Sequence, residues 1–304
     1  MRILVAIDGS PSSEAAVDEV CQRPWPVGSE VRLITVRPSL EIIRMQEAAG
    51  LPMEIENLYE HPDWETVKFL EDAAVKFEQR APGLKLTPAL LEGRAKDVIL
   101  DEAEQWVADL IVIGSNGFGI VRHLFLGSVS LAVALNATCS VEIVRFKHNV
   151  NFRKILLAVD GSPSSYAAVD EVCNRPWPAE SEVRVITVTQ PPKGCPGGIS
   201  GGETDPGCAY LLKQQSDNVA KLLNDVVTRI NERAPALKVS PVVLEGRPKD
   251  VVLDDAQQWG ADLIMVGSNG YGIIRHFILG SVALAVALNA GCSVKIVRLK
   301  GHIS

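Results

Sequence analysis

The sequence is poor in the features that mark nucleic-acid-binding proteins. Aromatic residues make up 5% of the 304 residues, and none of them alternates with a run of Lys or Arg. Neither half is basic, since the first 150 residues carry 14 basic and 22 acidic groups and the remainder carries 16 and 15. A nucleic-acid surface needs clustered cations that replace the counterions of the phosphates. The charge pattern therefore argues against a nucleic-acid partner.

Export and membrane signals are also missing. Asp8 interrupts the first apolar run, and only Arg2 precedes that run as a charged residue, which is not the pattern of a signal peptide. Two uncharged stretches, 124–141 and 277–294, have the 18 residues that would admit a membrane helix. A Gly-Ser pair and a central Asn divide each into a short helix and the start of a strand. We expect a cytoplasmic protein with no membrane partner.

The six cysteines do not form a metal-binding pattern, because neither CxxC nor HExxH occurs. Four of them lie at equivalent apolar positions of two repeats and are interpreted as buried small hydrophobic residues: Cys21 with Cys173, and Cys139 with Cys292. Cys195 and Cys208 have no counterparts. A reducing cytoplasm disfavours a disulfide between them.

An internal duplication covers nearly the whole chain. Residues 8–26 match 160–178 at 17 of 19 positions, and residues 108–139 match 261–292 at 24 of 32. Each repeat has roughly 150 residues, enough to bury its own core. We predict two domains, 1–147 and 153–300, joined by a short polar bridge.

Each repeat alternates apolar strand patterns with helix patterns. In the first repeat, Ser10 followed by Pro11 predicts a helix start, and Pro88 predicts an edge strand. The pattern predicts an α/β fold of two tandem doubly wound, Rossmann-like domains, each a mostly parallel five-stranded sheet with helices on both faces. Strands are expected at 3–7, 31–36, 84–91, 110–113 and 141–145, and helices from residue 11 and at 64–79, 97–106 and 126–136. Ligands of such sheets bind at the carboxyl ends of the strands.

A glycine pattern follows the fourth strand of each repeat. Gly114-Ser-Asn-Gly117 is followed after nine residues by Gly127-Ser128, and Gly267-Ser-Asn-Gly270 by Gly280-Ser281. Glycines between a strand and a helix let backbone N–H groups approach a phosphate. The pattern is neither a Walker A motif nor the dinucleotide fingerprint. A strand–helix turn without any ligand is the alternative interpretation.

The pattern Gly-x2-Gly-x9-Gly-Ser resembles the nucleotide-binding motif of the universal stress protein family. The opening Ile-Leu-Val-Ala-Ile-Asp-Gly-Ser, the closing Cys-Ser-Val-Glu-Ile-Val-Arg and the repeated Glu-Gly-Arg at residues 92–94 and 245–247 are similar to that family too. The resemblance extends over both repeats, so the chain is identified as a tandem member of the ATP-binding branch. It implies a stress-response regulatory protein that binds ATP, with or without Mg²⁺.

The resemblance also implies a role for particular residues. A strand-end aspartate would accept hydrogen bonds from the ribose or adenine, a strand-end valine would lay its backbone against adenine, and the glycine loop and following helix start would hold the phosphates. The residues of the first repeat are Asp8, Val36, Gly114, Gly117, Gly127, Ser128, Val129 and Ser130. Those of the second are Asp160, Val188, Gly267, Gly270, Gly280, Ser281 and Val282. Each of the pairs Arg122-His123 and Arg275-His276 either contacts the phosphates or consists of a solvated loop arginine and a packing histidine.

Three functions stay open on the sequence alone: an ATP-binding regulator with one site per repeat, a slow ATPase or self-phosphorylating enzyme, and a scaffold with empty sites. No acidic cluster or P-loop lysine supports fast phosphoryl transfer, so we assign no catalytic and no metal-binding residue. We expect the last strands of the two repeats to pair and form an internal pseudo-dimer. The resemblance also allows a homodimer of whole chains. Residues 191–210, half of which are Gly or Pro, are predicted to form a mobile loop.

Overall fold

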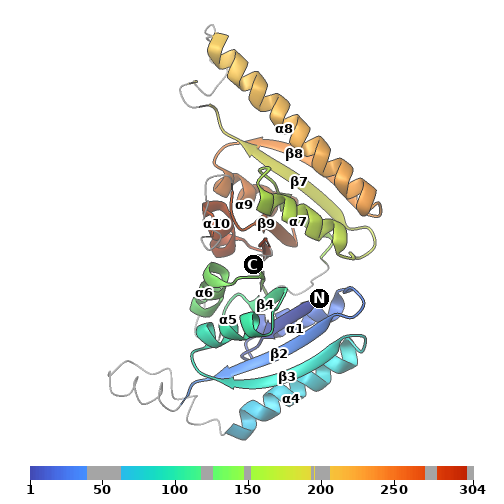
Figure 1. The fold of residues 1–304 in the computed structure, drawn as a ribbon, viewed down its shortest axis with the longest axis vertical. Coiled ribbons are helices and arrows are strands. Elements are labelled where there is room, and N and C mark those ends of the chain that lie inside the picture. The colour runs from blue at the N-terminus through green and yellow to red at the C-terminus, as the bar shows by residue number, and fades with distance from the viewer. Residues whose placement is uncertain are drawn as a thin grey trace, which may run out of the picture.

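The two repeats form one elongated α/β molecule, with the first repeat in its lower half and the second in its upper half (Figure 1). The structure is a computed structural model and describes residues 1–39, 63–117, 126–146, 152–192, 195, 206–270 and 279–299. Its strands make a ten-stranded sheet in the order β3-β2-β1-β4-β5-β10-β9-β6-β7-β8. Each repeat thus contributes five strands with the same order, which confirms the predicted tandem doubly wound fold.

All strand pairs within a repeat are parallel. The order reverses between β1 and β4, and between β6 and β9, which is where such sheets bind ligands. The first repeat contains β1 (Arg2–Ala6), β2 (Glu30–Arg37), β3 (Lys85–Glu92), β4 (Leu110–Gly114) and β5 (Ser140–Val144). The second contains β6 (Lys154–Ala158), β7 (Glu182–Thr189), β8 (Lys238–Glu245), β9 (Leu263–Gly267) and β10 (Ser293–Val297).

Helices cover both faces of the sheet in the described residues (Figure 1). One face carries α1 (Pro11–Gln22), α4 (Asp63–Arg80), α7 (Pro163–Asn174) and α8 (Pro206–Arg233). The other carries α5 (Ala95–Gln105), α6 (Ser128–Asn136), α9 (Pro248–Trp259) and α10 (Ser281–Asn289).

Local sequence signals explain several of these boundaries. The Ser10 side chain accepts a hydrogen bond from the Ser13 N–H and Pro11 begins α1, which confirms the predicted helix start. Pro88 lies in β3, an outer strand, where its missing N–H interrupts no hydrogen bond on the open side.

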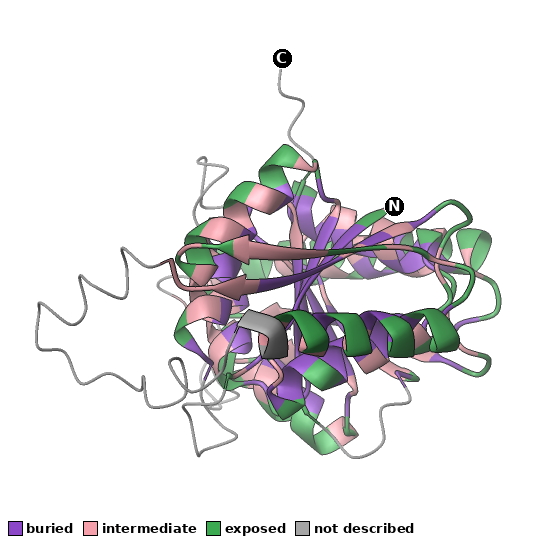
Figure 2. Ribbon diagram, turned by 90° about the horizontal axis from the view of Figure 1, so that it is seen from below, coloured by how far each residue is buried: buried purple, intermediate pink, exposed green. Residues whose placement is uncertain are grey.

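Among the described residues, one face of the sheet has a core that is continuous across the two repeats. Beneath α5, α6, α10 and α9, a single cluster of buried apolar residues runs from Leu4 of β1 to Ile296 of β10. On the opposite face each repeat has its own cluster, one around Phe77 and one around Ile230. Figure 2 shows the buried strands between helices whose outer sides are exposed. The repeats therefore share a core as well as a strand pair.

The two repeats meet at their last strands, which pair antiparallel. Lys295 of β10 stands opposite Glu142 of β5, and both side chains are 0% exposed. Arg23 donates two hydrogen bonds to the Glu142 carboxylate, and Arg175 lies 3.6 Å from it. Lys295 donates to Glu171. Burial lowers the pKa of Arg23, Arg175 and Lys295, so all three cations depend on the carboxylates around them.

This charge cluster is asymmetric at one position only. Glu19 of α1 corresponds to Glu171 of α7, and Arg23 and Arg175 directly follow these two helices, but Glu142 corresponds to Lys295. A like-with-like pairing of repeats in the same register would bring two buried carboxylates or two buried ammonium groups together. The charges therefore favour pairing of the first repeat with the second.

The structure corrects two expectations for residues 191–210. Helix α8 begins at Pro206, so the last five residues are helical rather than part of a loop. Proline suits the first position of a helix, because its missing N–H would have no partner there. Residues 193–194 and 196–205 lie outside the described part of the chain. Cys195 and Cys208 are joined by a disulfide, contrary to expectation, because the start of α8 brings their Cα atoms to 5.6 Å.

Exchanging the two central charges tests the cluster. Glu142→Lys or Lys295→Glu alone should lower the free energy of unfolding by about 3–5 kcal/mol, because each leaves buried like charges together. The double exchange rebuilds the cluster with the two repeats reversed and should recover most of that loss. Urea denaturation measures all four chains. A double variant that loses the sum of both single effects would show that the two residues do not interact.

Candidate functional site

The glycine loop of each repeat starts where the chain passes very close to the first helix. A Cβ atom at Gly114 would lie 2.6 Å from the carbonyl carbon of Ser12, and one at Gly267 would lie 2.6 Å from that of Ser164. These are backbone atoms, which cannot move away by a change of rotamer as a side chain can. Glycine at the end of β4 and β9 therefore lets α1 and α7 pack against the strand ends.

The strand-end aspartate lies directly over the second glycine of the loop. Gly9 has a φ of 85°, and the turn lets the Ser10 N–H and hydroxyl reach Oδ1 of Asp8 at 3.0 and 2.6 Å. No donor reaches its Oδ2 from the described residues. A Cβ atom at Gly117 would lie 2.7 Å from that oxygen. Asp8 thus keeps one carboxylate oxygen available for a ligand. Asp160 and Gly270 repeat the approach at 2.7 Å.

Serines at the start of the first helix tie it to the glycine loop. The Ser12 hydroxyl donates to the Asn116 carbonyl, and Oγ of Ser10, whose one proton points to Asp8, lies 3.0 Å from the same carbonyl oxygen. In the second repeat, the hydroxyls of Ser162 and Ser164 both donate to the Asn269 carbonyl. These bonds fix the loop against the helix.

The helix after the loop begins without a side-chain cap. Gly127 is the N-cap of α6, and its own N–H donates to the Ser115 carbonyl at 2.8 Å. Donors for a ligand are therefore the next backbone N–H groups, those of Ser128 and Val129, rather than that of Gly127. The buried Ser130 hydroxyl donates to the Gly114 carbonyl at 2.7 Å, which gives it a structural partner. Its counterpart in α10 is Ala283.

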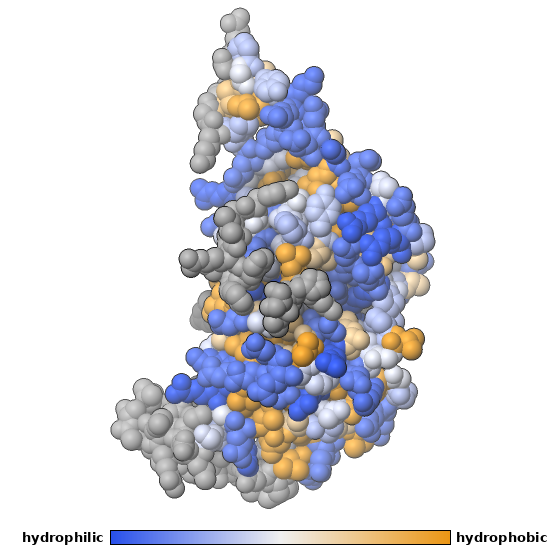
Figure 3. All heavy atoms as spheres, viewed as in Figure 1, coloured by the Kyte–Doolittle hydropathy of each residue, from blue (hydrophilic) through white to orange (hydrophobic). Residues whose placement is uncertain are grey.

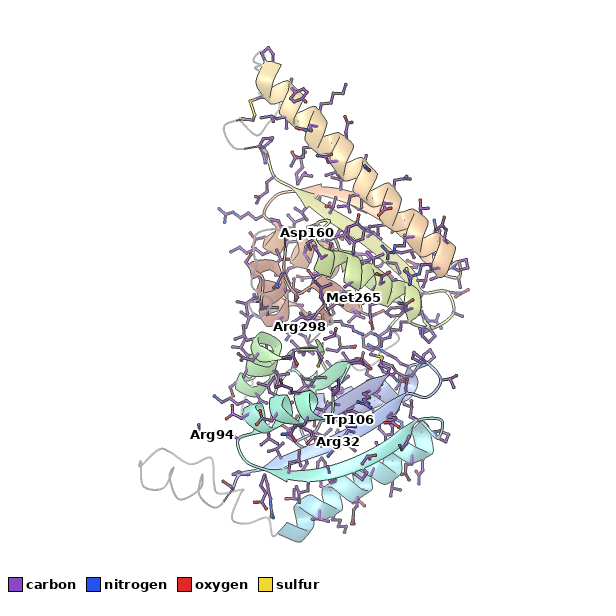
Figure 4. All side chains as sticks on the ribbon, in the orientation of Figure 1. Arg32, Arg94, Trp106, Asp160, Met265 and Arg298 are labelled. Atoms are coloured by element: carbon purple, nitrogen blue, oxygen red, sulfur yellow. A yellow bond between two sulfur atoms is a disulfide. The ribbon has the colours of Figure 1, made fainter. Side chains whose placement is uncertain are left out.

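In the second repeat these features line a pocket of about 290 Å³. Asp160 is labelled in Figure 4, in the upper half of the molecule. All seven residues that the sequence assigned to this repeat line the pocket: Asp160, Val188, Gly267, Gly270, Gly280, Ser281 and Val282. The first-repeat residues share the same strand ends, close approaches and helix start.

Further lining residues come from elements that the sequence analysis did not connect to the site. They include Ser162 and Ser165 at the start of α7, and Pro248 and Val252 of α9. Pro248 directly follows the repeated Glu-Gly-Arg motif at residues 245–247. That motif is the signal in the sequence that could have placed the start of α9 at the site. The first turns of α7, α9 and α10 therefore all contribute residues to the lining of the pocket. The two Arg-His dipeptides, at residues 122–123 and 275–276, lie outside the described residues.

The described residues give little support to a metal site, a reactive thiol or a membrane span. Among them, no group of three or more His, Cys, Asp or Glu side chains could hold a metal ion. Burial raises the pKa of the Cys21 and Cys139 thiols to about 11, so these thiols stay protonated near neutral pH. No helix in the described ranges combines the length and apolar character of a membrane span.

The family model described as "Universal stress protein family" matches residues 1–145 and 151–298. The chain belongs to the universal stress protein family. A universal stress protein of Mycolicibacterium smegmatis is 25% identical over 303 residues, covering 97% of this chain and 96% of the relative. One from Mycobacterium tuberculosis H37Rv is 25% identical over 313 residues, with the same coverage. The crystal structure of a universal stress protein from Archaeoglobus fulgidus shares the fold, with a TM-score of 0.59 at 20% identity over 98% of this chain and 96% of that one.

The close approach at Gly114 can be tested on stability. We expect Gly114→Ala to lower the free energy of unfolding by about 1–3 kcal/mol, because the added Cβ meets backbone atoms of α1. Gly83→Ala is the matched control, since a Cβ there meets nothing within 4 Å. Urea denaturation of both variants gives the comparison. Equal stability of the two would mean that α1 does not press on the strand end.

Proposed function

We propose that this universal stress protein is a stress-response regulator that binds one ATP in each repeat. The single observation that carries the proposal is the second-repeat pocket, which gathers a strand-end carboxylate, a glycine loop and uncapped helix starts. Its volume of about 290 Å³ is at the lower end of the range for small-molecule sites.

The phosphates would bind at the start of α6 and α10. The N-cap of each helix is a glycine, which has no side chain to accept from the first N–H groups, and the helix adds partial positive charge there. In the second repeat the residues are Ser281 and Val282, with the hydroxyl of Ser281 as a further donor. A side chain at Gly270 would press on the Asp160 carboxylate, and one at Gly280 would press on the backbone of the glycine loop, so either would distort the site.

The adenosine would bind at the opposite side of the pocket. Oδ2 of Asp8 or Asp160 accepts a hydrogen bond from the ribose or the adenine amino group, and the strand ends at Val36 and Val188 flank the base. Ile186 and Val252 give this side of the second pocket its apolar walls. Specificity for adenine then comes from strand-end backbone, with Asp8 or Asp160 setting the orientation.

Mg²⁺ would enter on the nucleotide, held by its phosphates. No acidic cluster of the described residues supplies a metal site of its own. In-line phosphoryl transfer needs a positioned metal, an oriented nucleophile and cationic stabilisation. The described pocket residues supply one strand-end carboxylate, backbone N–H groups and serine hydroxyls but no cation, so we propose that the chain responds to ATP occupancy and at most hydrolyses ATP slowly.

The two sites would work within one closed internal pseudo-dimer. The strand pair β5–β10 and the shared core support this arrangement. Because the pairing uses the last strand of each repeat, a homodimer of whole chains would have to use another surface.

Calorimetric titration of the nucleotide-stripped chain tests the proposal. We expect two ATP per chain for the wild type, about one for Gly127→Val or Gly280→Val, and about none for the double variant. Gly127 has φ −64° and ψ 155°, which valine adopts freely, so the effect comes from side-chain bulk. The added side chain presses on the loop, where a Cβ already lies 3.3 Å from the Ser115 carbonyl oxygen.

Gly83→Val and Gly291→Val are the matched controls, one in each repeat, since a Cβ at either position meets nothing within 4 Å. Both should keep two sites. Thermal stability should also rise with added ATP in the wild type and in the controls but not in the double variant. A wild-type chain that takes up no ATP would contradict the proposal.

A further inference from the structure

Two buried arginines cross the junction between the repeats. Arg145 follows β5 of the first repeat, and its Nη2 donates to the Ala287 carbonyl of α10 in the second repeat at 2.8 Å. Arg298 follows β10 of the second repeat, and its Nη2 donates to the Ala134 carbonyl of α6 in the first. Figure 4 shows Arg298 at the junction, between the two halves of the molecule.

Each arginine thus binds the carboxyl end of the helix whose other end forms the candidate phosphate site of the opposite repeat. Helix α6 has nine residues and spans about 14 Å. Its last carbonyls carry partial negative charge, which a cation at that end offsets. With that negative charge offset, the positive electrostatic potential at the start of the helix is stronger.

These arginines have no acidic partner among the described residues. Arg145 is 5% exposed and Arg298 is 7% exposed, and Nε of each has no hydrogen-bond partner in the part of the chain that the structure describes. Desolvation lowers the pKa of both guanidinium groups. Burying a cation without a carboxylate is unfavourable, so local stability alone does not account for the pair.

The main chain beside each arginine also leads directly to the glycine loop of its own repeat. The carbonyl of Val144, next to Arg145, accepts the Ser115 N–H at 2.8 Å, and the carbonyl of Val297, next to Arg298, accepts the Ser268 N–H at 2.8 Å. Each glycine loop is therefore connected through one residue to the helix of the other site.

We propose that Arg145 and Arg298 are positioning residues that act on the nucleotide site of the opposite repeat, and that they couple the two sites. This inference rests on the proposed function. Under this proposal, replacing Arg298 in the second repeat weakens ATP binding at the site of the first repeat. Replacing Arg145 in the first repeat weakens ATP binding at the site of the second.

Chains with one blocked site test the crossing. In the Gly280→Val background, which leaves the first site, Arg298→Met should weaken ATP binding roughly five- to tenfold in titration calorimetry. In the Gly127→Val background, which leaves the second site, Arg145→Met should do the same. In each background the arginine of the opposite repeat should have the larger effect. Arg298→Lys keeps the charge and should recover part of the affinity.

Arg80→Met is the control, because Arg80 pairs with Asp18 on the surface and should leave affinity in both backgrounds unchanged. Hydrogen exchange gives a readout that needs no nucleotide: Arg298→Met should speed exchange at the end of α6 more than at the end of α10. If the Gly280→Val chain binds no ATP, the nucleotide assignment fails and this inference with it. If the two single-site chains bind ATP but Arg298→Met weakens binding equally in both backgrounds, or in neither, only the crossed role is overturned.

Discussion

The antiparallel pairing of β5 with β10 is the constraint on which the rest of the molecule depends. It places Glu142 opposite Lys295 in full burial, where the two are stable only when Arg23, Arg175 and Glu171 surround them. A shift of register by one residue would turn these charges into the apolar core on the other face of the sheet. The charge cluster therefore fixes the register, and the register fixes how every other element of one repeat faces the other.

The candidate sites inherit their geometry from this junction. With the register fixed, α6 lies against α10, and each crossing arginine reaches the carbonyls at the end of the opposite helix. The same two strands end beside Ser115 and Ser268, at the start of the glycine loops. The face shown in Figure 3 mixes hydrophilic and hydrophobic residues, so surface hydropathy does not help to explain the geometry of the sites. The exposed apolar side chains at the start of α8, such as Tyr210, lie far along the chain from the junction.

The sequence predicted what local pattern and duplication determine. Alternating strands and helices, the Ser10 cap and the outer position of Pro88 follow from neighbours along the chain. The second-repeat pocket is lined by the seven residues that the family resemblance implied. The charge cluster could not be predicted, because Arg23 and Glu142 meet only through the fold. The same holds for Pro248 at the pocket and for the disulfide that α8 brings together. The hydrogen bond from the Gly127 N–H to Ser115 also needed the structure. The domain limits 1–147 and 153–300 stay predictions.

The central claim is that each repeat holds one ATP at its glycine loop. Native mass spectrometry of the nucleotide-stripped chain with added ATP and Mg²⁺ tests it most directly, because each bound nucleotide adds a discrete mass to the intact protein. We expect a single chain that carries two nucleotides at saturation, with both adducts removed when Gly117 and Gly270 are each replaced by Val. A chain that saturates at no adduct, or that carries two adducts which survive this double replacement, would contradict it.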